Sequence, residues 1–124
     1  EVRGETFIGL ADFRELNRKL LEAGETPYAN PRNFTSGSIK QLDPKVTASR
    51  PLRFAAYGMG RVKGRSYQTH SESLEELRSF GLPIVEHLER LESVDQVQGY
   101  YQRMLDLRDK LDYEIDGIVI KGMI

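Results

Sequence analysis

The run from Ala29 to Asp43, ANPRNFTSGSIKQLD, constrains the fold more than any other part of the chain. It is dense in amide, hydroxyl and cationic side chains, with a glycine at its centre and few apolar residues. Ordering such a segment costs backbone entropy and buries little surface, so we predict a polar loop rather than a core element. Its specific donors suit phosphates or a nucleic-acid backbone, and the alternative is an ordinary solvated loop.

The distribution of charge favours an anionic ligand near this run. The net charge is −1, yet residues 31–68 carry eight basic side chains and one acidic side chain, a local charge of +7. Residues 1–30 have four basic and six acidic side chains, and residues 69–124 have six and twelve. A basic stretch between acidic flanks predicts a surface that binds a polyanion, with a solvated basic face as the alternative. The basic residues are Arg32, Lys40, Lys45, Arg50, Arg53, Arg61, Lys63 and Arg65.

Length and composition exclude several classes of protein. With 124 residues, 39% of them hydrophobic, the chain can form one domain, or part of one, with a modest core. It has no cysteine, so disulfides and thiolate zinc sites are excluded. His70 and His87 lack the spacing of a ligand pair, and we interpret both as ordinary surface histidines. No apolar run reaches the roughly 18–20 residues of a membrane span, so no membrane contact is expected.

Hydrophobic patterning predicts an α+β fold. Strands are expected over residues 1–10, 52–60 and 114–121. Helices are expected over residues 12–24, 69–81 and 93 to about 111. Asp12 is the expected N-cap of the first helix and Gly24 its C-terminal glycine. In the second helix, Leu74, Leu77 and Phe80 are expected to face inward. Because neither end of the chain carries a start or stop signal, we expect both ends to be cut through a larger fold.

Three short motifs carry residues that suit chemistry. In EVRGE, Glu5 follows a strand glycine and its carboxylate suits ribose hydroxyls, although an ion pair between Arg3 and Glu5 is the more ordinary interpretation. In FAAYG, Tyr57 is either a ring that stacks on a base or a core tyrosine. In EIDGIVIK, Lys121 interrupts an otherwise apolar strand, which predicts an ammonium aimed at an anion, with a lysine at the mouth of a barrel as the alternative.

Taken together and in this order, EVRGE, ANPRN–SGSIKQLD, FAAYG and EIDGIVIK closely resemble the adenylation domain of bacterial NAD-dependent DNA ligases. The resemblance runs from Glu1 to Lys121. That family belongs to the covalent nucleotidyltransferases, with ATP-dependent ligases and messenger-RNA capping enzymes. It therefore implies their α+β fold, in which mostly antiparallel sheets are flanked by helices. Residues 1–124 are expected to be the C-terminal part of the adenylation domain, truncated at both ends.

The resemblance implies roles for residues that bind the nucleotide. Glu5 would bind the ribose of the adenylate, and Tyr57 would stack on adenine. Arg32 would contact a phosphate, either on the nucleotide or on the nicked strand. Arg108 matches an arginine of the same site. Lys40 stands where the family usually has arginine, so a point charge replaces a planar bidentate group.

Two residues are expected to be catalytic. Lys121 would reach the adenylate phosphate or the edge of the base, and Asp116 matches the acidic residue of the family's fourth motif. The nucleophile of the family is a lysine in a K-x-D-G motif, and no such tetrapeptide occurs in this chain. In the family that lysine lies upstream of the EVRGE strand. The segment alone is therefore expected to be inactive.

The resemblance implies a parent enzyme that seals nicks in duplex DNA. A lysine would attack NAD, release nicotinamide mononucleotide and pass AMP to the 5′-phosphate of the nick before the strand is sealed. The implied partners are NAD and nicked duplex DNA, with Mg²⁺ at the site and Zn²⁺ in a module outside this chain. The parent is expected to be a monomer in the bacterial cytoplasm. The alternatives are an ATP-dependent ligase or capping-type nucleotidyltransferase, and a nucleic-acid-binding domain without catalysis.

Overall fold

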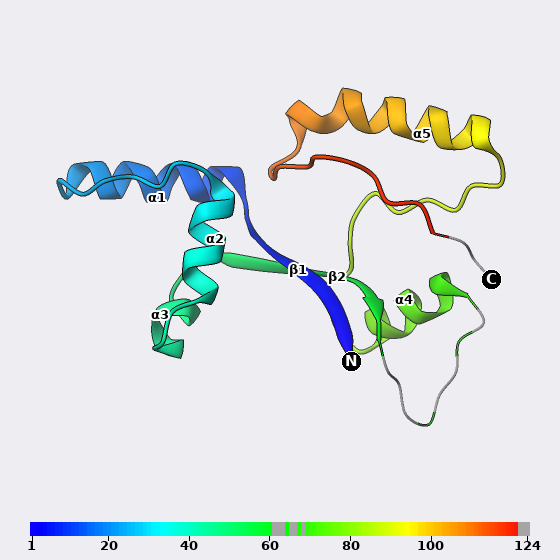
Figure 1. Ribbon diagram of the computed structural model, residues 1–124, viewed down its shortest axis with the longest axis horizontal. Coiled ribbons are helices and arrows are strands. Elements are labelled where there is room, and N and C mark those ends of the chain that lie inside the picture. The colour runs from blue at the N-terminus through cyan, green and yellow to red at the C-terminus, as the bar shows by residue number, and fades with distance from the viewer. Residues whose placement is uncertain (61–63, 65–66, 68, 122–124) are drawn as a thin grey trace. The chain divides into compact units, whose positions relative to one another are not determined.

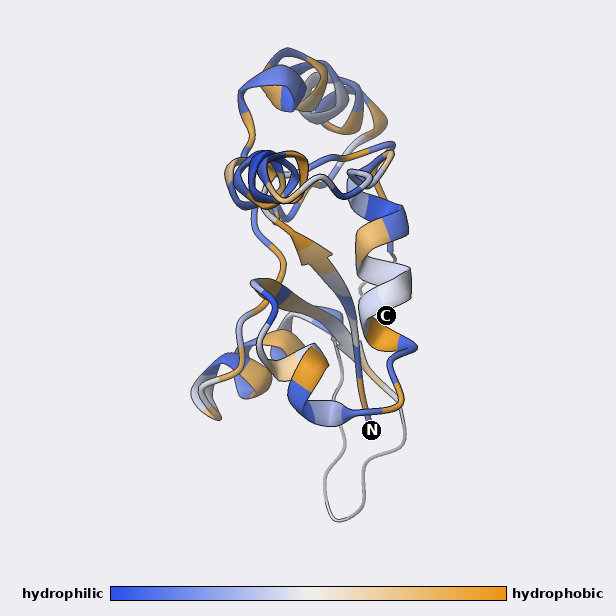
Figure 2. Ribbon diagram, turned by 90° about the vertical axis from the view of Figure 1, so that its left-hand side faces the viewer, coloured by the Kyte–Doolittle hydropathy of each residue, from blue (hydrophilic) through white to orange (hydrophobic). Residues whose placement is uncertain are grey.

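The computed structural model describes residues 1–60, 64, 67 and 69–121 (Figure 1). Along the chain, the described elements are β1 (Val2–Ile8), α1 (Leu10–Glu22), α2 (Pro31–Ile39), α3 (Pro44–Ala48), β2 (Leu52–Met59), α4 (His70–Ser79), α5 (Val94–Leu107) and a 3₁₀ turn (Arg108–Lys110). The helices carry both hydrophilic and hydrophobic residues (Figure 2), as expected of helices that bury one face. The α+β class predicted from the sequence is confirmed.

Strands β1 and β2 pair in a two-stranded sheet. The pairing is antiparallel: Gly60 N donates to Glu1 O at 2.9 Å, and Gly4 faces Ala55 further along. The strands predicted over residues 1–10 and 52–60 are thus confirmed. The strand predicted over residues 114–121 is wrong, because all eight of these residues lie outside regular structure. β-branched residues favour an extended backbone, but a strand also needs a partner edge, which local sequence does not specify.

The chain divides into two compact units. Unit 1 comprises Glu1–Glu5, Phe54–Leu105 and Asp116–Ile124, and unit 2 comprises Thr6–Arg53 and Asp106–Ile115. The chain enters each unit more than once, and β1 and β2 contribute residues to both. Each unit therefore depends on segments that are distant in sequence.

The core of unit 1 forms where helix α4 packs on β2. Ala56, Leu74 and Leu77 are at most 1% exposed. Helix α4 starts as predicted, because the Thr69 hydroxyl accepts a hydrogen bond from Glu72 N at 3.2 Å. Phe80, which the sequence pattern placed on the inner face, is 60% exposed instead. It is the C-cap residue, where the chain leaves the helix and no longer follows its apolar stripe.

Helix α5 also begins at the predicted cap. Ser93 Oγ accepts from Gln96 N at 3.2 Å, and Gln96 Oε1 accepts from Glu92 N at 2.7 Å. The α-helix ends at Leu107, earlier than the expected Leu111, because the chain tightens there into the 3₁₀ turn.

In unit 2, helix α1 has an N-terminus that differs from the prediction. The N-cap residue is Gly9, which offers no side-chain cap, and Asp12 lies inside the first turn. The free N–H groups are satisfied from a distant segment: Leu10 N donates to Asp112 O at 2.8 Å, and Ala11 N donates to Asp112 Oδ1 at 3.0 Å. The predicted end is confirmed, since Gly24 follows the helix with φ +75°.

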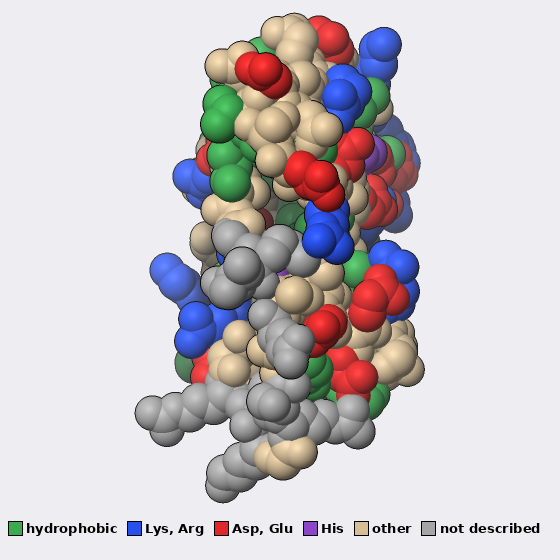
Figure 3. Space-filling view, turned by 90° about the vertical axis from the view of Figure 1, so that its right-hand side faces the viewer, with side chains coloured by type: hydrophobic (Ala, Val, Ile, Leu, Met, Phe, Trp, Pro, Cys, Tyr) green, Lys and Arg blue, Asp and Glu red, His purple; other side chains and the backbone are tan. Residues whose placement is uncertain are grey.

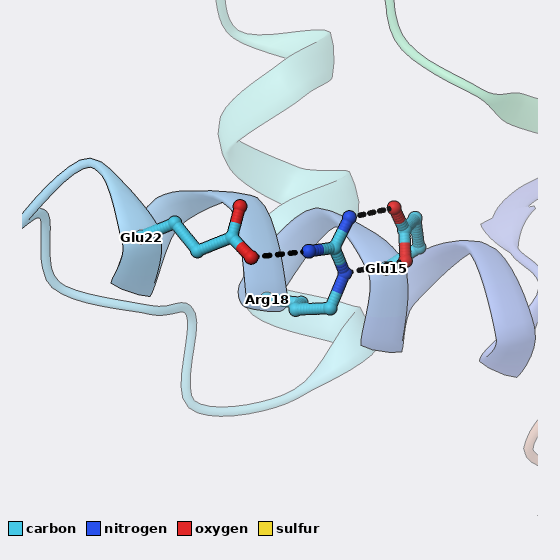
Figure 4. Close-up of polar contacts among 3 residues, drawn as sticks. All are labelled: Glu15, Arg18 and Glu22. Carbon is cyan, nitrogen blue, oxygen red and sulfur yellow. Dashed lines mark hydrogen bonds and ion pairs between the residues drawn. The ribbon is translucent and has the colours of Figure 1, made fainter.

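Three charged side chains of α1 pair with one another along its exposed face (Figure 4). The Arg18 guanidinium donates to both carboxylate oxygens of Glu15, at 2.5 and 2.9 Å, and also pairs with Glu22. These contacts hold the pKa of Glu15 below its ordinary value, chiefly through the hydrogen bond from Arg18. Spacings of three and four residues bring such groups together on a helix. Arg18 therefore has acidic partners within its own helix.

The run from Ala29 to Asp43 is not a loop, contrary to the prediction. It contains α2, which starts where Asn30 Oδ1 accepts from Asn33 N at 2.8 Å with Pro31 in the first turn. Phe34 is 1% exposed and meets the Tyr28 ring edge-on at 5.1 Å. Because one aromatic side chain and satisfied hydroxyls can fill a small core, the polar run forms the centre of unit 2.

Candidate functional site

Tyr57 and Lys121 come together in unit 1, although they are far apart in sequence. Tyr57 lies on β2 and Lys121 on the extended segment near the C-terminus. Lys121 Nζ is 5.3 Å from the centroid of the Tyr57 ring, which is a cation–π distance. The ring is 41% exposed, so it is not the core tyrosine of the alternative interpretation. An exposed ring with a cation beside it can receive an aromatic, negatively charged ligand.

Gly58, the next residue of β2, is buried and lies beneath two polar side chains. A Cβ at this position would lie 3.4 Å from His70 Cε1 and 3.8 Å from Lys121 Nζ. The imidazole and the ammonium thus approach the same point on the strand. A larger residue at position 58 would compete with both for this space.

His70 is the residue of this cluster that sequence reasoning missed. It is the first residue of α4 and is half-buried rather than an ordinary surface histidine. Burial lowers the pKa of His70, and the positive charge of Lys121 lowers it further, while a hydrogen bond with the Tyr57 backbone opposes both. The Thr69–Glu72 capping pattern placed His70 at the start of a helix, but nothing near it in the sequence indicated a role beside Tyr57 and Lys121.

Glu5 and Asp116 also belong to unit 1. Glu5 is an exposed residue of β1, and Asp116 is exposed in the same extended segment as Lys121. Arg3 donates to Glu1 Oε1 at 2.9 Å, so in the described part of the chain its carboxylate partner is Glu1 rather than Glu5. A Cβ at Gly4 would overlap the Phe54 ring and lie 2.6 Å from Ala55 O. That glycine is thus required by the neighbouring strand.

The other three predicted site residues lie in unit 2, and all are exposed. Arg32 is in the first turn of α2, Lys40 is its C-cap, and Arg108 opens the 3₁₀ turn. At 1.5 Å per residue, the backbones of Arg32 and Lys40 are about 12 Å apart along the helix axis. The two cations therefore suit different phosphates rather than a single phosphate.

Two arginines of the basic stretch have structural partners in unit 2. Arg53 donates to Asp112 Oδ2 at 2.8 Å. Arg50 donates to Ser38 Oγ at 2.8 Å and stacks over the Phe34 ring at 5.2 Å. These contacts favour a role in the fold for both. Arg61, Lys63 and Arg65 lie outside the described residues, and basic side chains on the face shown in Figure 3 are interspersed with acidic ones.

An open hollow of about 470 Å³ beside α4 includes none of the predicted site residues. Acidic side chains dominate its lining, which suits phosphate poorly. The lining residues are Thr69, Ser71, Glu72, Glu75, Glu76 and Arg90.

Within residues 1–60, 64, 67 and 69–121, no three His, Asp or Glu residues lie close enough together to hold a metal ion. No helix in this part of the chain is both long and apolar enough to cross a membrane.

Comparison with known proteins gives the family. The model of the NAD-dependent DNA ligase adenylation domain matches residues 1–122. The chain is 47% identical over 121 residues to a DNA ligase of Roseiflexus sp. (strain RS-1), covering 98% of this chain and 17% of that protein. It is 48% identical over 122 residues to a DNA ligase of Nitrosococcus oceani, covering 98% and 18% respectively. The chain belongs to the family of NAD-dependent DNA ligase adenylation domains, and it spans less than a fifth of those relatives.

Proposed function

We propose that this chain binds the adenylate in a DNA ligase that uses NAD to seal nicks in duplex DNA. The observation that carries the proposal is the Tyr57–Lys121 pair, in which an exposed ring lies 5.3 Å from an ammonium group. Adenine has a flat face that stacks on an aromatic ring, and AMP carries a phosphate that attracts a cation. One site thus offers both interactions that an adenine nucleotide needs.

Further roles are assigned to the predicted residues within each unit, Glu5 and Asp116 in unit 1 and the three cations in unit 2. The Glu5 carboxylate accepts hydrogen bonds from the ribose hydroxyls. Arg32, Lys40 and Arg108 supply positive charge to phosphates of the nucleotide or of the nicked strand. Because charge builds up on phosphoryl oxygens during transfer, fixed cations stabilise the transition state. Asp116, in the same extended segment as Lys121, acts in the part of the site where the phosphoryl group is transferred.

NAD enters the reaction as a substrate. A lysine Nζ attacks its α-phosphate, and the phosphorus–oxygen bond to nicotinamide mononucleotide breaks. AMP then passes from the lysine to the 5′-phosphate of the nick, and the 3′-hydroxyl displaces AMP to form the phosphodiester. Since no K-x-D-G tetrapeptide occurs in this chain, we assign the nucleophile to another part of the parent protein. Within the described residues, no group of three His, Asp or Glu side chains could hold a metal ion, and no step is assigned to Mg²⁺.

Labelling of the full-length parent tests the proposal. The protein is incubated with NAD labelled in its AMP portion, and separately with ATP labelled in the same portion. We expect the protein to become labelled from NAD, with release of nicotinamide mononucleotide, and not from ATP. Label from ATP would favour an ATP-dependent ligase or a capping-type enzyme. Nicked-DNA binding without label from either nucleotide would favour a binding domain without catalysis.

A further inference from the structure

His70 is a third member of the Tyr57–Lys121 cluster, and the proposed reaction does not use it. It comes from a different element: Tyr57 is on β2, His70 opens α4, and Lys121 lies in the extended C-terminal segment. His70 Cε1 and Lys121 Nζ lie 3.4 and 3.8 Å from the position of a Cβ on Gly58. Both groups thus lie within about 4 Å of one point on β2, where Gly58 is buried, His70 is half-buried and Lys121 is exposed.

The proximity of Lys121 favours the uncharged imidazole of His70. A neutral imidazole can lie beside an ammonium group, whereas an imidazolium would place two positive charges side by side. Within the described residues, the side chain whose charge acts on His70 is Lys121, from the C-terminal segment. The neighbouring β2 contributes the backbone of Tyr57, which hydrogen-bonds to the imidazole. No carboxylate is among the causes that shift the pKa of His70 there, and the Glu1 carboxylate lies over Gly60, two residues further along the chain from Gly58.

We propose that the neutral imidazole of His70 positions the Lys121 ammonium beside the Tyr57 ring, and that protonation of His70 drives this ammonium away from the nucleotide site. The inference rests on the proposed function, because it assumes that Lys121 contacts the adenine nucleotide. His70 is thus a positioning residue that acts through Lys121. Its consequence is that the affinity for NAD falls as the pH drops below the ordinary pKa of histidine.

Burial of His70 agrees with this direction. Its pKa is lowered from the ordinary value of 6.5, first by burial and then by Lys121, so the imidazole is neutral at pH 7 and above. NAD is a suitable probe because its pyrophosphate keeps the same charge throughout the range from about pH 5.5 to 8. A change in NAD affinity over this range therefore reports on the protein and not on the ligand.

The test compares variants of the full-length parent enzyme between about pH 5.5 and 8. The quantities measured are the KM for NAD and the maximal rate of protein adenylation. For the wild type, we expect the KM to rise as the pH falls. In His70→Gln, which cannot gain a proton, this rise should be lost. In His70→Lys, which places a second ammonium group near Lys121, the KM at pH 8 should be roughly fivefold above that of the wild type, the order of repulsion between two unit charges a few Å apart in water.

His87→Asn is the matched control, because His87 is the other histidine of the chain and is not part of this cluster. Its backbone has φ +58°, a conformation that asparagine tolerates. This variant should keep the pH profile of the wild type. Circular dichroism and thermal unfolding of each variant establish that the compared proteins are folded.

If the KM of His70→Gln rises at low pH as much as that of the wild type, the inference is overturned. A KM of His70→Lys equal to that of the wild type at pH 8 would also overturn it. Either result, with normal labelling by NAD, leaves the proposed function intact. Failure of the wild type to be labelled by NAD at any pH would instead contradict the proposed function. The two failures are therefore distinguishable.

Discussion

Asp112 caps helix α1 from 101 residues away in sequence: its Oδ1 accepts a hydrogen bond from the backbone N–H of Ala11 at 3.0 Å. The other carboxylate oxygen accepts from Arg53 at 2.8 Å. The Asp112 side chain thus caps the N-terminus of α1 and links this helix to Arg53, near the beginning of β2. These contacts lie within unit 2, and they tie its two sequence segments together.

Replacement of Asp112 should loosen the start of α1. The Ala11 N–H, and next the Arg53 guanidinium, hold the pKa of Asp112 below its ordinary value of 3.8. The carboxylate therefore contributes stability that is fully present above pH 3.8 and is lost as the pH falls through the lowered pKa. We expect Asp112→Asn to speed amide hydrogen exchange at Leu10 and Ala11 at pH 7, with a smaller difference from the wild type near pH 3.

Asp109→Asn is the control for this prediction, because Asp109 is an exposed residue of the adjacent 3₁₀ turn. Its exchange rates in α1 should match those of the wild type. Equal exchange at Leu10 and Ala11 in Asp112→Asn and the wild type at pH 7 would show that the charge of Asp112 contributes nothing to the cap.

Lys121→Ala should slow nucleotidyl transfer in the parent enzyme by about 100-fold or more, since it leaves a phosphate charge without its cation. The single-turnover rate of adenylation with NAD measures this loss. Lys19→Ala, an exposed lysine of α1, should leave the rate unchanged. If Lys121→Ala instead stays within about threefold of the wild type, Lys121 is a structural residue.

The elements that the sequence predicted correctly depend on residues within a few positions of one another. Thr69 and Glu72 start α4, Ser93 and Gln96 start α5, and Gly24 ends α1. The errors involve partners that are distant in the chain. Asp12 was predicted as the cap of α1 because it lies near the start of the helix. The residue that caps the helix is Asp112, which is 101 residues away from Ala11 in sequence. The run around Phe34 looked like a loop because Arg50 and Tyr28, which cover that ring, lie outside it.

The candidate site shows the same difference between residues that are close in sequence and residues that are distant. Tyr57 and Lys121 were predicted as site residues from short motifs. In the structure, Lys121 Nζ lies 5.3 Å from the centroid of the Tyr57 ring. His70 carries no local signal of its role, since its importance depends on Gly58 from one segment and Lys121 from another. The roles of Glu5, Arg32, Lys40, Arg108 and Asp116 stay predictions.

Phosphate contacts in the basic stretch should be measurable by salt dependence. Each true contact with the DNA backbone that is removed should lower the slope of log affinity against log salt by roughly 0.9. We expect this change for Arg32→Gln and Lys45→Gln, which alter exposed residues of α2 and α3. Arg53→Gln should leave the slope unchanged and destabilise unit 2, because Arg53 pairs with Asp112.

The affinity of the parent enzyme for nicked duplex DNA, measured at several salt concentrations, gives these slopes. The same set of variants should include Arg61→Gln, Lys63→Gln and Arg65→Gln, which test the rest of the predicted polyanion surface. Unchanged slopes in all of them would identify the basic stretch as a solvated face.

Substitutions at Tyr57 separate stacking on adenine from packing in the core. The ring is 41% exposed, so its truncation should have little effect on the fold. Tyr57→Phe keeps the stacking face and should bind adenine nucleotides almost as the wild type does. Tyr57→Ala should weaken this binding by about 1–3 kcal/mol, the range measured for stacking of bases on aromatic side chains.

Leu74→Ala provides the contrast, because Leu74 is 1% exposed and belongs to the core of unit 1. Loss of this side chain should lower the free energy of unfolding by about 2–5 kcal/mol, as truncation of a buried leucine does elsewhere. Thermal unfolding and nucleotide affinity, measured on the same samples, distinguish the two kinds of residue. If Tyr57→Ala behaves like Leu74→Ala, with a large loss of stability and unchanged affinity in the folded molecules, the ring packs in the core and does not hold adenine.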